Sequence, residues 1–324
     1  MQAIVYTKYG PPDVLKLADV EKPAPKDNEV LVKVRAVAAN AADWRLMRAD
    51  PFLARFYSGL LKPKYNILGS DIAGWVEAVG KNVERFKQGD EVFGGLAECG
   101  WGGFAEYACA HENALVDKPA NISFEEAASV PMAGVTALIG LRDAGKIKPR
   151  QKVLINGAAG GVGTFAVQIA KWFGAEVTAV CGAGNLAMAR SLGADHVIDY
   201  TQEDFTKSGR RYDLILAVNG YHSIFEYRHA LSAGGIYVMV GGSPAQLFQA
   251  LLLGPFISMA GTKKMGSLTV RTSQKDLAFL GELLKAGKVS PVIDRCYTLK
   301  EVPEAIRYLE GGHAKGKLVI TVEQ

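Results

Sequence analysis

Apolar and polar residues alternate along the first third of the chain, which is the pattern of strands with one buried face. Residues 30–37 carry valine and alanine on one side and Lys33 and Arg35 on the other. The same pattern returns at residues 72–79 and 91–93, after glycine-rich turns. We therefore predict that the chain begins with a β-rich region, a small barrel or sandwich.

The pattern changes near Ser123, which precedes two acidic residues and is typical of a helix N-cap. A helix is predicted to follow through Ala127 to Ala144. Continuous apolar strands then alternate with helices, which indicates a parallel sheet covered on both faces. From about residue 266 the pattern is mixed again and ends in a strand at 317–322. The strands predicted for the parallel sheet are residues 153–155, 176–180, 197–200, 214–218 and 236–240.

Composition narrows the class of protein without identifying a function. Apolar residues make up 49% and charged residues 22% of the 324, which excludes a disordered or fibrous chain. The net charge of +4 has no basic block behind it, so nucleic-acid binding is not indicated. The four cysteines form no C-x-x-C pair, which favours a reducing compartment.

The most apolar segment, residues 247–260, is interrupted by Gln249 and by Gly254-Pro255. It is shorter than the roughly 20 residues of a membrane-spanning helix. We predict a buried or interface helix here rather than membrane contact, and no integral membrane span. The first residues lack the pattern of a secretory signal, so the expected location is cytoplasmic, with an organelle as the alternative.

A glycine-rich turn between a strand and a helix carries the clearest chemistry. It spans residues 157–163 and follows the strand at 153–155. In this context Gly160, Gly161 and Val162 would present backbone amides to a pyrophosphate, and Gly163 would allow close packing of the helix. The alternative is a tight turn without a ligand. The sequence therefore predicts a dinucleotide site.

The turn after the second strand bears on the choice of dinucleotide. NAD enzymes usually carry an acid at this position for the ribose 2′-hydroxyl. Residues 181–185 contain none, and we expect Cys181, Gly182 and Asn185 to line a site for NADPH, with NADH less favoured. The turn also lacks an arginine, so Arg190 and Lys171 are candidates for the 2′-phosphate only through their proximity in sequence.

The chain resembles the zinc-free quinone oxidoreductases of the medium-chain dehydrogenase/reductase superfamily over essentially its whole length. The resemblance rests on residues 9–15, 40–43, 69–74, 157–163, 193–195 and 316–319. It implies an α/β fold with a GroES-like, β-rich catalytic domain at 1–122 and 266–324. A Rossmann domain with a doubly wound parallel sheet would span 123–265. It also implies a homodimer.

The same resemblance argues against zinc. Zinc alcohol dehydrogenases of the superfamily carry a cysteine near Asn40 and a histidine where this chain has Ser70. Only Cys99 and Cys109 lie where the structural zinc lobe needs four thiolates. Without a Lewis acid, a quinone or an α,β-unsaturated carbonyl is an easier hydride acceptor than a simple ketone, because its enolate spreads the charge.

Individual site residues follow from the resemblance, each beside an ordinary structural role. Asn40 matches a position at the nicotinamide end, or is a turn residue. Thr136 matches a position that contacts the cofactor phosphate or nicotinamide. Tyr200 matches a position near the adenosine end. Lys317 matches a position facing the cleft, although a solvated charge is its default role. Tyr57 and Tyr65 lie in the segment between Asp43 and Gly69 that should border the substrate, as hydrogen-bond or proton donors or as packing aromatics. Gly241 and Gly242, after the last predicted parallel strand, fit a cofactor loop.

These features predict an NADPH-dependent, zinc-independent reductase of quinones or α,β-unsaturated carbonyls that acts by hydride transfer. The alternative is a dinucleotide-binding redox sensor or structural protein without significant turnover, since a fold and its nucleotide site can outlast the chemistry. A zinc alcohol dehydrogenase is a third, less favoured interpretation.

Overall fold

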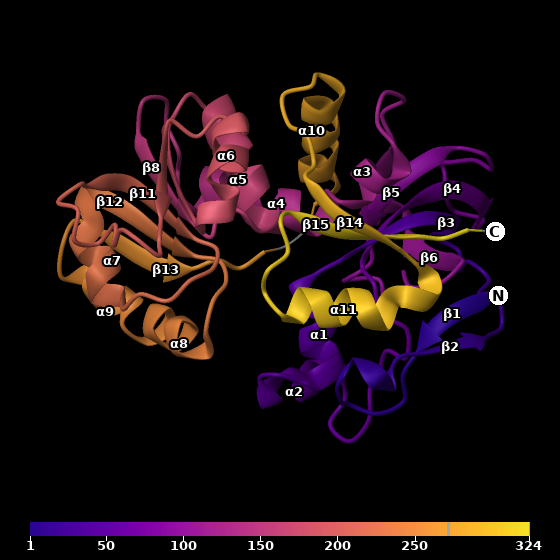
Figure 1. Ribbon diagram of the computed structural model, residues 1–324. Helices are drawn as coiled ribbons and strands as arrows, with labels where there is room; N and C mark the ends of the chain where they lie inside the picture. Colours follow the sequence, from indigo (N-terminus) through magenta and orange to yellow (C-terminus); the bar gives the residue numbers. More distant parts are fainter. Residues whose placement is uncertain (271–272, 324) are drawn as a thin grey trace. The chain divides into compact units, whose positions relative to one another are not determined.

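The computed structural model describes residues 1–270 and 273–323, which form two compact units (Figure 1). Unit 1 consists of Met1–Ala133 and Thr272–Gln324, and unit 2 of Gly134–Arg271. The two ends of the chain therefore build one unit, and the middle of the chain builds the other. The domain boundary predicted at 265/266 falls inside a strand, β13 (Lys264–Ser267), that the sequence pattern did not indicate.

Unit 1 is organised around a seven-stranded sheet. The C-terminal strand β15 (Lys317–Thr321) pairs antiparallel with β3 (Glu29–Ala39), which joins the end of the chain to its beginning. The alternating valines of β3 are fully buried, as the pattern predicts. The remaining strands are β4 (Asp71–Val79), β5 (Glu91–Gly95), β6 (Tyr107–His111), β7 (Leu115–Asp117) and β14 (Ile293–Thr298), with β1 (Gln2–Val5) and β2 (Lys16–Asp19) as a separate pair.

Unit 1 also contains several helices. Ser123 caps α3 (Phe124–Ala128) with a capping box: its hydroxyl accepts from Glu126 N–H, and the Glu126 carboxylate accepts from Ser123 N–H. The other helices are α1 (Ala41–Arg48), α2 (Arg55–Ser58), α10 (Gln274–Lys285) and α11 (Val302–Glu310), with 3₁₀ turns at Pro12–Val14, Phe52–Ala54, Glu112–Ala114 and Leu299–Glu301.

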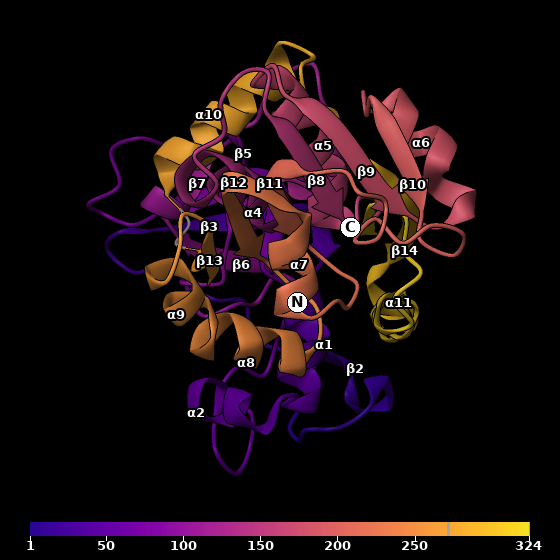
Figure 2. The same cartoon turned by 90° about the vertical axis from the view of Figure 1, so that its left-hand side faces the viewer.

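Unit 2 contains a six-stranded, fully parallel sheet, as predicted. Its strand order is β10-β9-β8-β11-β12-β13, which in order of appearance is 3-2-1-4-5-6, the doubly wound order. Figures 1 and 2 show α5 and α6 on one side of it and α7 on the other. Besides β13, the strands are β8 (Lys152–Asn156), β9 (Glu176–Cys181), β10 (His196–Asp199), β11 (Tyr212–Ala217) and β12 (Leu231–Met239). The helices are α5 (Gly161–Trp172), α6 (Leu186–Ser191), α7 (Ile224–Ala230), α8 (Pro244–Leu252) and α9 (Gly254–Met259), with a 3₁₀ turn at Ala183–Asn185.

The helix predicted over Ala127 to Ala144 is not continuous. It ends at Ala128, restarts as α4 (Pro131–Ile139) and continues as a π-helical turn, Gly140–Ala144. Pro131 explains the break, because proline has no N–H to donate and disfavours a helical conformation in the residue before it.

The apolar segment at 247–260 forms α8 and α9, and most of its large side chains are exposed. The prediction of a buried helix is therefore wrong, and the alternative of an interface helix stays a prediction. Within residues 1–270 and 273–323, no helix combines the length and the apolar character that crossing a membrane requires.

Candidate functional site

The glycine-rich turn connects β8, at the centre of the parallel sheet, to α5. Gly157 has a φ of +87°, which a side chain would strain. A Cβ on Gly163 would lie 2.2 Å from the Gly157 carbonyl oxygen, so only glycine allows α5 to approach the strand this closely. The first N–H groups of α5 have no acceptor within the helix and are available to an anion. This local geometry fits a pyrophosphate.

The turn at the end of β9 is the second part of the candidate nucleotide site. Tyr200 follows β10 directly, and its N–H donates to Cys181 O at 3.2 Å. A Cβ on Gly182 would lie 3.5 Å from the Tyr200 ring, which shows how closely the ring approaches this turn. Asn185 Oδ1 is buried and accepts no hydrogen bond from the residues described. A hydroxyl of a bound ribose would satisfy this atom, so the turn fits a nucleotide.

Two charged groups lie near this turn, Arg190 and Asp199, and the sequence analysis considered only the first. Burial raises the pKa of the Cys181 thiol, Asp199 raises it further, and Arg190 lowers it. Asp199 is paired in register with Cys181 but is occupied locally, because it accepts from the N–H and hydroxyl of Thr201. Arg190 is exposed. The turn therefore has a cation nearby and an acid that is already hydrogen-bonded.

The other candidates of unit 2 occupy different places relative to this sheet edge. Gly241 and Gly242 follow β12 at the carboxyl edge, the edge at which the turn after β8 also begins. Thr136 is nearly buried on α4. Lys171 lies near the C-terminal end of α5 and forms an ion pair with Asp195 at 2.8 Å, so it does not serve the nucleotide turn.

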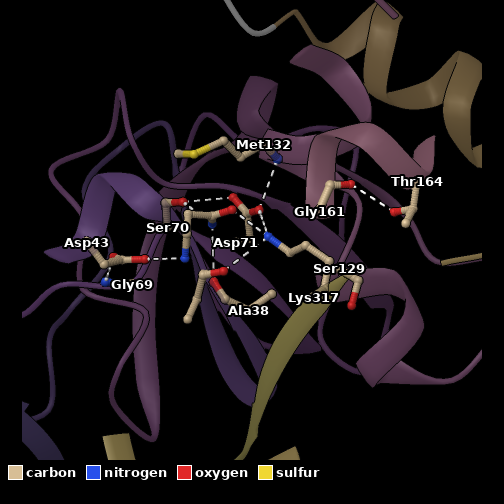
Figure 3. A network of polar contacts seen from close by, with 12 residues as sticks. Ala38, Asp43, Gly69, Ser70, Asp71, Ser129, Met132, Gly161, Thr164 and Lys317 are labelled. Atoms are coloured by element: carbon tan, nitrogen blue, oxygen red, sulfur yellow. Dashed lines mark hydrogen bonds and ion pairs between the residues drawn. The ribbon is translucent and has the colours of Figure 1, made fainter. Parts of the chain in front are cut away.

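In unit 1, Lys317 belongs to a buried polar network with Ser70 and Asp71 (Figure 3). The buried side chain of Asn40 belongs to the same network. Lys317 Nζ donates to Asn40 Oδ1 at 2.5 Å and to Ala39 O at 3.2 Å, and lies 3.8 Å from Asp71 Oδ2. Ser70 Oγ donates to Asp71 Oδ1 at 2.7 Å and accepts from Asn40 Nδ2 at 3.4 Å. Lys317 is only 3% exposed, so its default role as a solvated charge is wrong.

The network contains a second carboxylate, on Asp43, which is fully buried. It accepts from the N–H of Asn40 at 2.7 Å and of Gly69 at 2.9 Å. Burial raises the pKa of Asp43 to about 7, although these two bonds lower it, with smaller contributions from Asp71 and Lys317. Burial also raises the pKa of Asp71, and the Lys317 charge partly offsets this rise. Burial lowers the pKa of Lys317, and the Asp71 charge partly offsets that fall.

The raised pKa of Asp43 predicts a pH-dependent stability. A carboxyl whose folded pKa exceeds its unfolded value stabilises the fold at low pH, and this contribution is lost as the pH rises from 3.8 to about 7. We expect the free energy of unfolding of the wild type, minus that of Asp43→Asn, to fall over this range. Urea unfolding at several pH values measures the difference. A flat difference would contradict a buried, titrating Asp43.

The two tyrosines considered for substrate contact lie together, at a ring-centroid distance of 5.8 Å. Tyr57 is half exposed, and its hydroxyl donates to Ala97 O at 3.1 Å and accepts from Trp101 Nε1 at 3.4 Å. Burial raises the pKa of Tyr57 further than the hydrogen bond from Trp101 lowers it. Its hydroxyl therefore stays protonated at neutral pH and keeps a proton that it can donate.

The side chains at the position of the superfamily's zinc site do not make a metal-binding set. Ser70 and Asn40 are engaged with each other, and the ammonium of Lys317 already lies beside Asp71. Across residues 1–270 and 273–323, no three histidine, cysteine, aspartate or glutamate side chains are close enough to hold an ion. Zinc therefore does not fit these donors, and zinc independence stays a prediction.

Comparison with known proteins agrees with this class of fold and site. Residues 26–120 match the alcohol dehydrogenase GroES-like domain, and residues 192–320 match the family described as zinc-binding dehydrogenase. The chain is 35% identical to the chloroplast envelope quinone oxidoreductase homolog of Arabidopsis thaliana, over 99% of this chain and 98% of that one. It is 37% identical to the 2-methylene-furan-3-one reductase of Solanum lycopersicum, over 99% of this chain and 79% of that one.

Solved structures show the same relationship. The quinone oxidoreductase from Coxiella burnetii superimposes with a TM-score of 0.89 at 33% identity, over 100% of this chain and 99% of that one. The quinone oxidoreductase of Escherichia coli, solved with NADPH, gives a TM-score of 0.84 at 26% identity, over 99% of this chain and 100% of that one. The fold and site are those of an NAD(P)H-dependent oxidoreductase. The chain belongs to the quinone oxidoreductase branch of the medium-chain dehydrogenase/reductase superfamily.

The sequence analysis missed the role of Asp43 and the acid at Asp199. The first could be suspected, because an aspartate at the N3 position of a helix that follows asparagine often bonds the N-cap backbone. Nothing local in the sequence shows that Asp199 pairs in register with Cys181, since that contact depends on the neighbouring strand.

Proposed function

We propose that the protein reduces quinones or α,β-unsaturated carbonyls with NADPH, by hydride transfer and without zinc. The observation that carries the proposal is the glycine turn between β8 and α5 at the centre of a sheet with doubly wound order. The names of the relatives support the substrate class, since they include quinone oxidoreductases and a 2-methylene-furan-3-one reductase. The cofactor is supported by the neighbour solved with NADPH.

Each part of the site has a separate task in this proposal. A bound nicotinamide supplies the hydride. The amides at the start of α5 hold the pyrophosphate, and Gly182, Asn185 and Tyr200 surround the adenosine ribose. Lys317 fixes the Asn40 side chain by holding its Oδ1 atom, so the amide cannot rotate freely. We propose that Asn40 borders the nicotinamide and that Thr136, Gly241 and Gly242 complete the cofactor contacts.

The polar groups favour an acceptor whose charge is delocalised after hydride transfer. The donors of Asn40 and Ser70 are already satisfied within the network, and no side chain there acts as a Lewis acid. An enolate or hydroquinone anion needs less stabilisation than a simple alkoxide. Tyr57, with Tyr65 packed beside it, would turn its half-exposed hydroxyl from Ala97 O to donate a hydrogen bond or a proton to that oxygen.

A substrate panel tests the reaction. Purified protein, NADPH or NADH, and a series of quinones, enones, ketones and alcohols are mixed, and the absorbance of the reduced nicotinamide is followed. We expect consumption of NADPH with quinones or enones only. Tight NADPH binding without consumption would favour the alternative, a redox sensor. Stoichiometric zinc by elemental analysis, with activity lost to a chelator, would instead show an alcohol dehydrogenase.

The preference for NADPH rests on the acid-free turn at residues 181–185 and on Arg190, whose charge acts on Cys181 in that turn. We expect Arg190→Gln to weaken NADPH binding by about tenfold, because a charge-assisted contact to the 2′-phosphate is lost. NADH binding should change little, since NADH lacks that phosphate. Titration of both cofactors measures the two dissociation constants. Lys171→Gln is the matched control, because its charge is paired with Asp195. Tighter binding of NADH than of NADPH by the wild type would refute the preference.

The assembly is proposed from the resemblance, and the location is the one expected in the sequence analysis. We propose a homodimer, which sedimentation at micromolar concentration tests, and a monomer there would refute it. We propose a cytoplasmic location, although the names of several relatives place those proteins in chloroplasts. Fractionation of the source cells decides between the two compartments.

A further inference from the structure

A cavity of about 290 Å³ lies at the amino edge of the parallel sheet in unit 2 and is called the amino-edge cavity below. The candidate nucleotide site lies at the opposite edge, where the glycine turn follows the last residue of β8. The two ends of β8 are about 13 Å apart, from a rise of about 3.3 Å per residue. The amino-edge cavity is therefore separate from the nucleotide site. The first residues of four neighbouring strands, β8 to β11, line it: Lys152, Glu176, His196 and Tyr212.

The hydroxyl of Tyr212 is a buried polar group without a partner. Tyr212 is 2% exposed, and within residues 1–270 and 273–323 no group forms a hydrogen bond with its hydroxyl. Burial raises the pKa of this hydroxyl, and the side chains of Thr178 and Arg210 lower it. Since both of these residues also line the amino-edge cavity, the hydroxyl lies on its cavity side. A ligand that accepts a hydrogen bond from Tyr212 would remove the free-energy cost of this unpaired group.

Positive charge surrounds the same cavity. Lys152, Arg210 and Arg211 line it and are exposed at its mouth, so a solute can reach them. The carboxylate of the lining, on Glu176, already lies 3.1 Å from His196 Nε2. With His196 neutral, three cations against one carboxylate leave an excess of two positive charges.

The loop that carries the two arginines is held by its own hydrogen bonds. Arg211 Nη1 donates to Gly209 O at 3.1 Å and to Arg210 O at 3.0 Å, and Arg211 Nη2 lies 3.2 Å from His229 Nε2. These contacts place a guanidinium at the cavity before any ligand binds. Glu203 of the same loop also acts on the Tyr212 hydroxyl, but less strongly than Arg210 does.

We propose that the amino-edge cavity binds a small phosphate monoester. Such a group carries a charge of about −1.5 to −2 at pH 7, which matches the excess of positive charge. Guanidinium groups bind phosphate oxygens through paired hydrogen bonds, and the hydroxyls of Tyr212 and Thr178 supply further donors. The volume is at the lower limit for small-molecule pockets, which suits a small metabolite better than a dinucleotide. A nucleic-acid strand fits less well, because the chain has no basic block along which its phosphates could lie.

Calorimetric titration of the NADPH-saturated protein with glycerol 3-phosphate tests the proposal. NADPH occupies the glycine turn, so the titration reports phosphate sites elsewhere. We expect one site per chain for glycerol 3-phosphate and none for glycerol. Arg210→Gln should weaken the binding by about tenfold or more, because a charge-assisted contact is lost. Arg85→Gln, at an exposed arginine of unit 1, is the matched control and should bind like the wild type.

The same site should persist when NADPH is omitted, and it should again depend on Arg210. The test therefore does not rely on the proposed reaction or its cofactor. Absence of binding by the wild type, or binding that Arg210→Gln leaves unchanged, would overturn the proposal. So would tighter binding of a single-stranded oligonucleotide that Arg210→Gln abolishes, because the cavity would then serve a nucleic acid.

Tyr212→Phe separates binding from structure. The hydroxyl forms no hydrogen bond with the residues described, so the free variant should unfold at the wild-type temperature or above it. Its affinity for glycerol 3-phosphate should nevertheless fall by about tenfold, because the phenol no longer donates to the phosphate. Thermal unfolding with and without glycerol 3-phosphate measures both effects. A free variant that unfolds well below the wild type, with its affinity unchanged, would contradict the role of Tyr212.

Discussion

Replacing Gly163 with alanine is expected to weaken NADPH binding by more than about a hundredfold, equivalent to roughly 3 kcal/mol. The new Cβ would lie 2.2 Å from Gly157 O and 2.7 Å from Ala158, distances at which backbone atoms must move. Because α5 would then tilt away from β8, its first amides would no longer point at one pyrophosphate. Fluorescence titration measures the binding, and thermal unfolding measures the accompanying loss of stability.

Gly160→Ala is the matched control for this prediction. Its nearest new contact would be Gly157 O at 3.9 Å, and the φ of −81° suits alanine, so the empty protein should unfold at the wild-type temperature. The added methyl group would occupy open space beside the amides. It should therefore weaken NADPH binding without lowering the unfolding temperature. If Gly163→Ala binds NADPH as well as the wild type, the glycine turn is not the pyrophosphate site.

The parts of the fold that could be predicted are those encoded by local patterns. The strand β8, the glycine turn and the helix α5 follow one another without interruption. The hydrophobic periodicity, the glycines of the turn and the start of the helix therefore all indicate the same strand–turn–helix motif. The alternating residues of β3 likewise identify a strand with one buried face. The break before Pro131 could also have been predicted, because proline carries that signal by itself.

The parts that could not be predicted depend on contacts between distant segments. Strand β13 has the sequence Lys-Met-Gly-Ser, which shows no strand pattern, and its place is fixed by pairing with β12. Lys317 reads as a surface charge until β15 is placed beside β3, where Asn40 and Asp71 surround its ammonium. The outward leucines of α8 look like core residues, because the pattern shows that a helix is amphipathic but not which face the fold covers.

Replacing Lys317 with methionine is expected to lower the free energy of unfolding at neutral pH by about 3–5 kcal/mol, the usual cost of removing one partner from a buried ion pair. The Asp71 carboxylate would lose the cation 3.8 Å away, and Asn40 Oδ1 would lose its donor. The loss should shrink as the pH falls, because the pKa of Asp71, already raised by burial, would rise further and the carboxyl would take up a proton. Urea unfolding at several pH values measures both effects.

A double-mutant cycle separates the lost ion pair from lost packing. Asp71→Asn alone leaves the Lys317 ammonium buried without its carboxylate and should also destabilise the protein. The double variant, Asp71→Asn with Lys317→Met, leaves neither member of this pair charged and should be more stable than the sum of the single losses predicts. If Lys317 also positions Asn40, the double variant keeps its fold but loses kcat, since the amide oxygen still lacks its donor. Strictly additive losses, with kcat unchanged in the folded double variant, would mean that the network neither pairs these charges nor positions the amide.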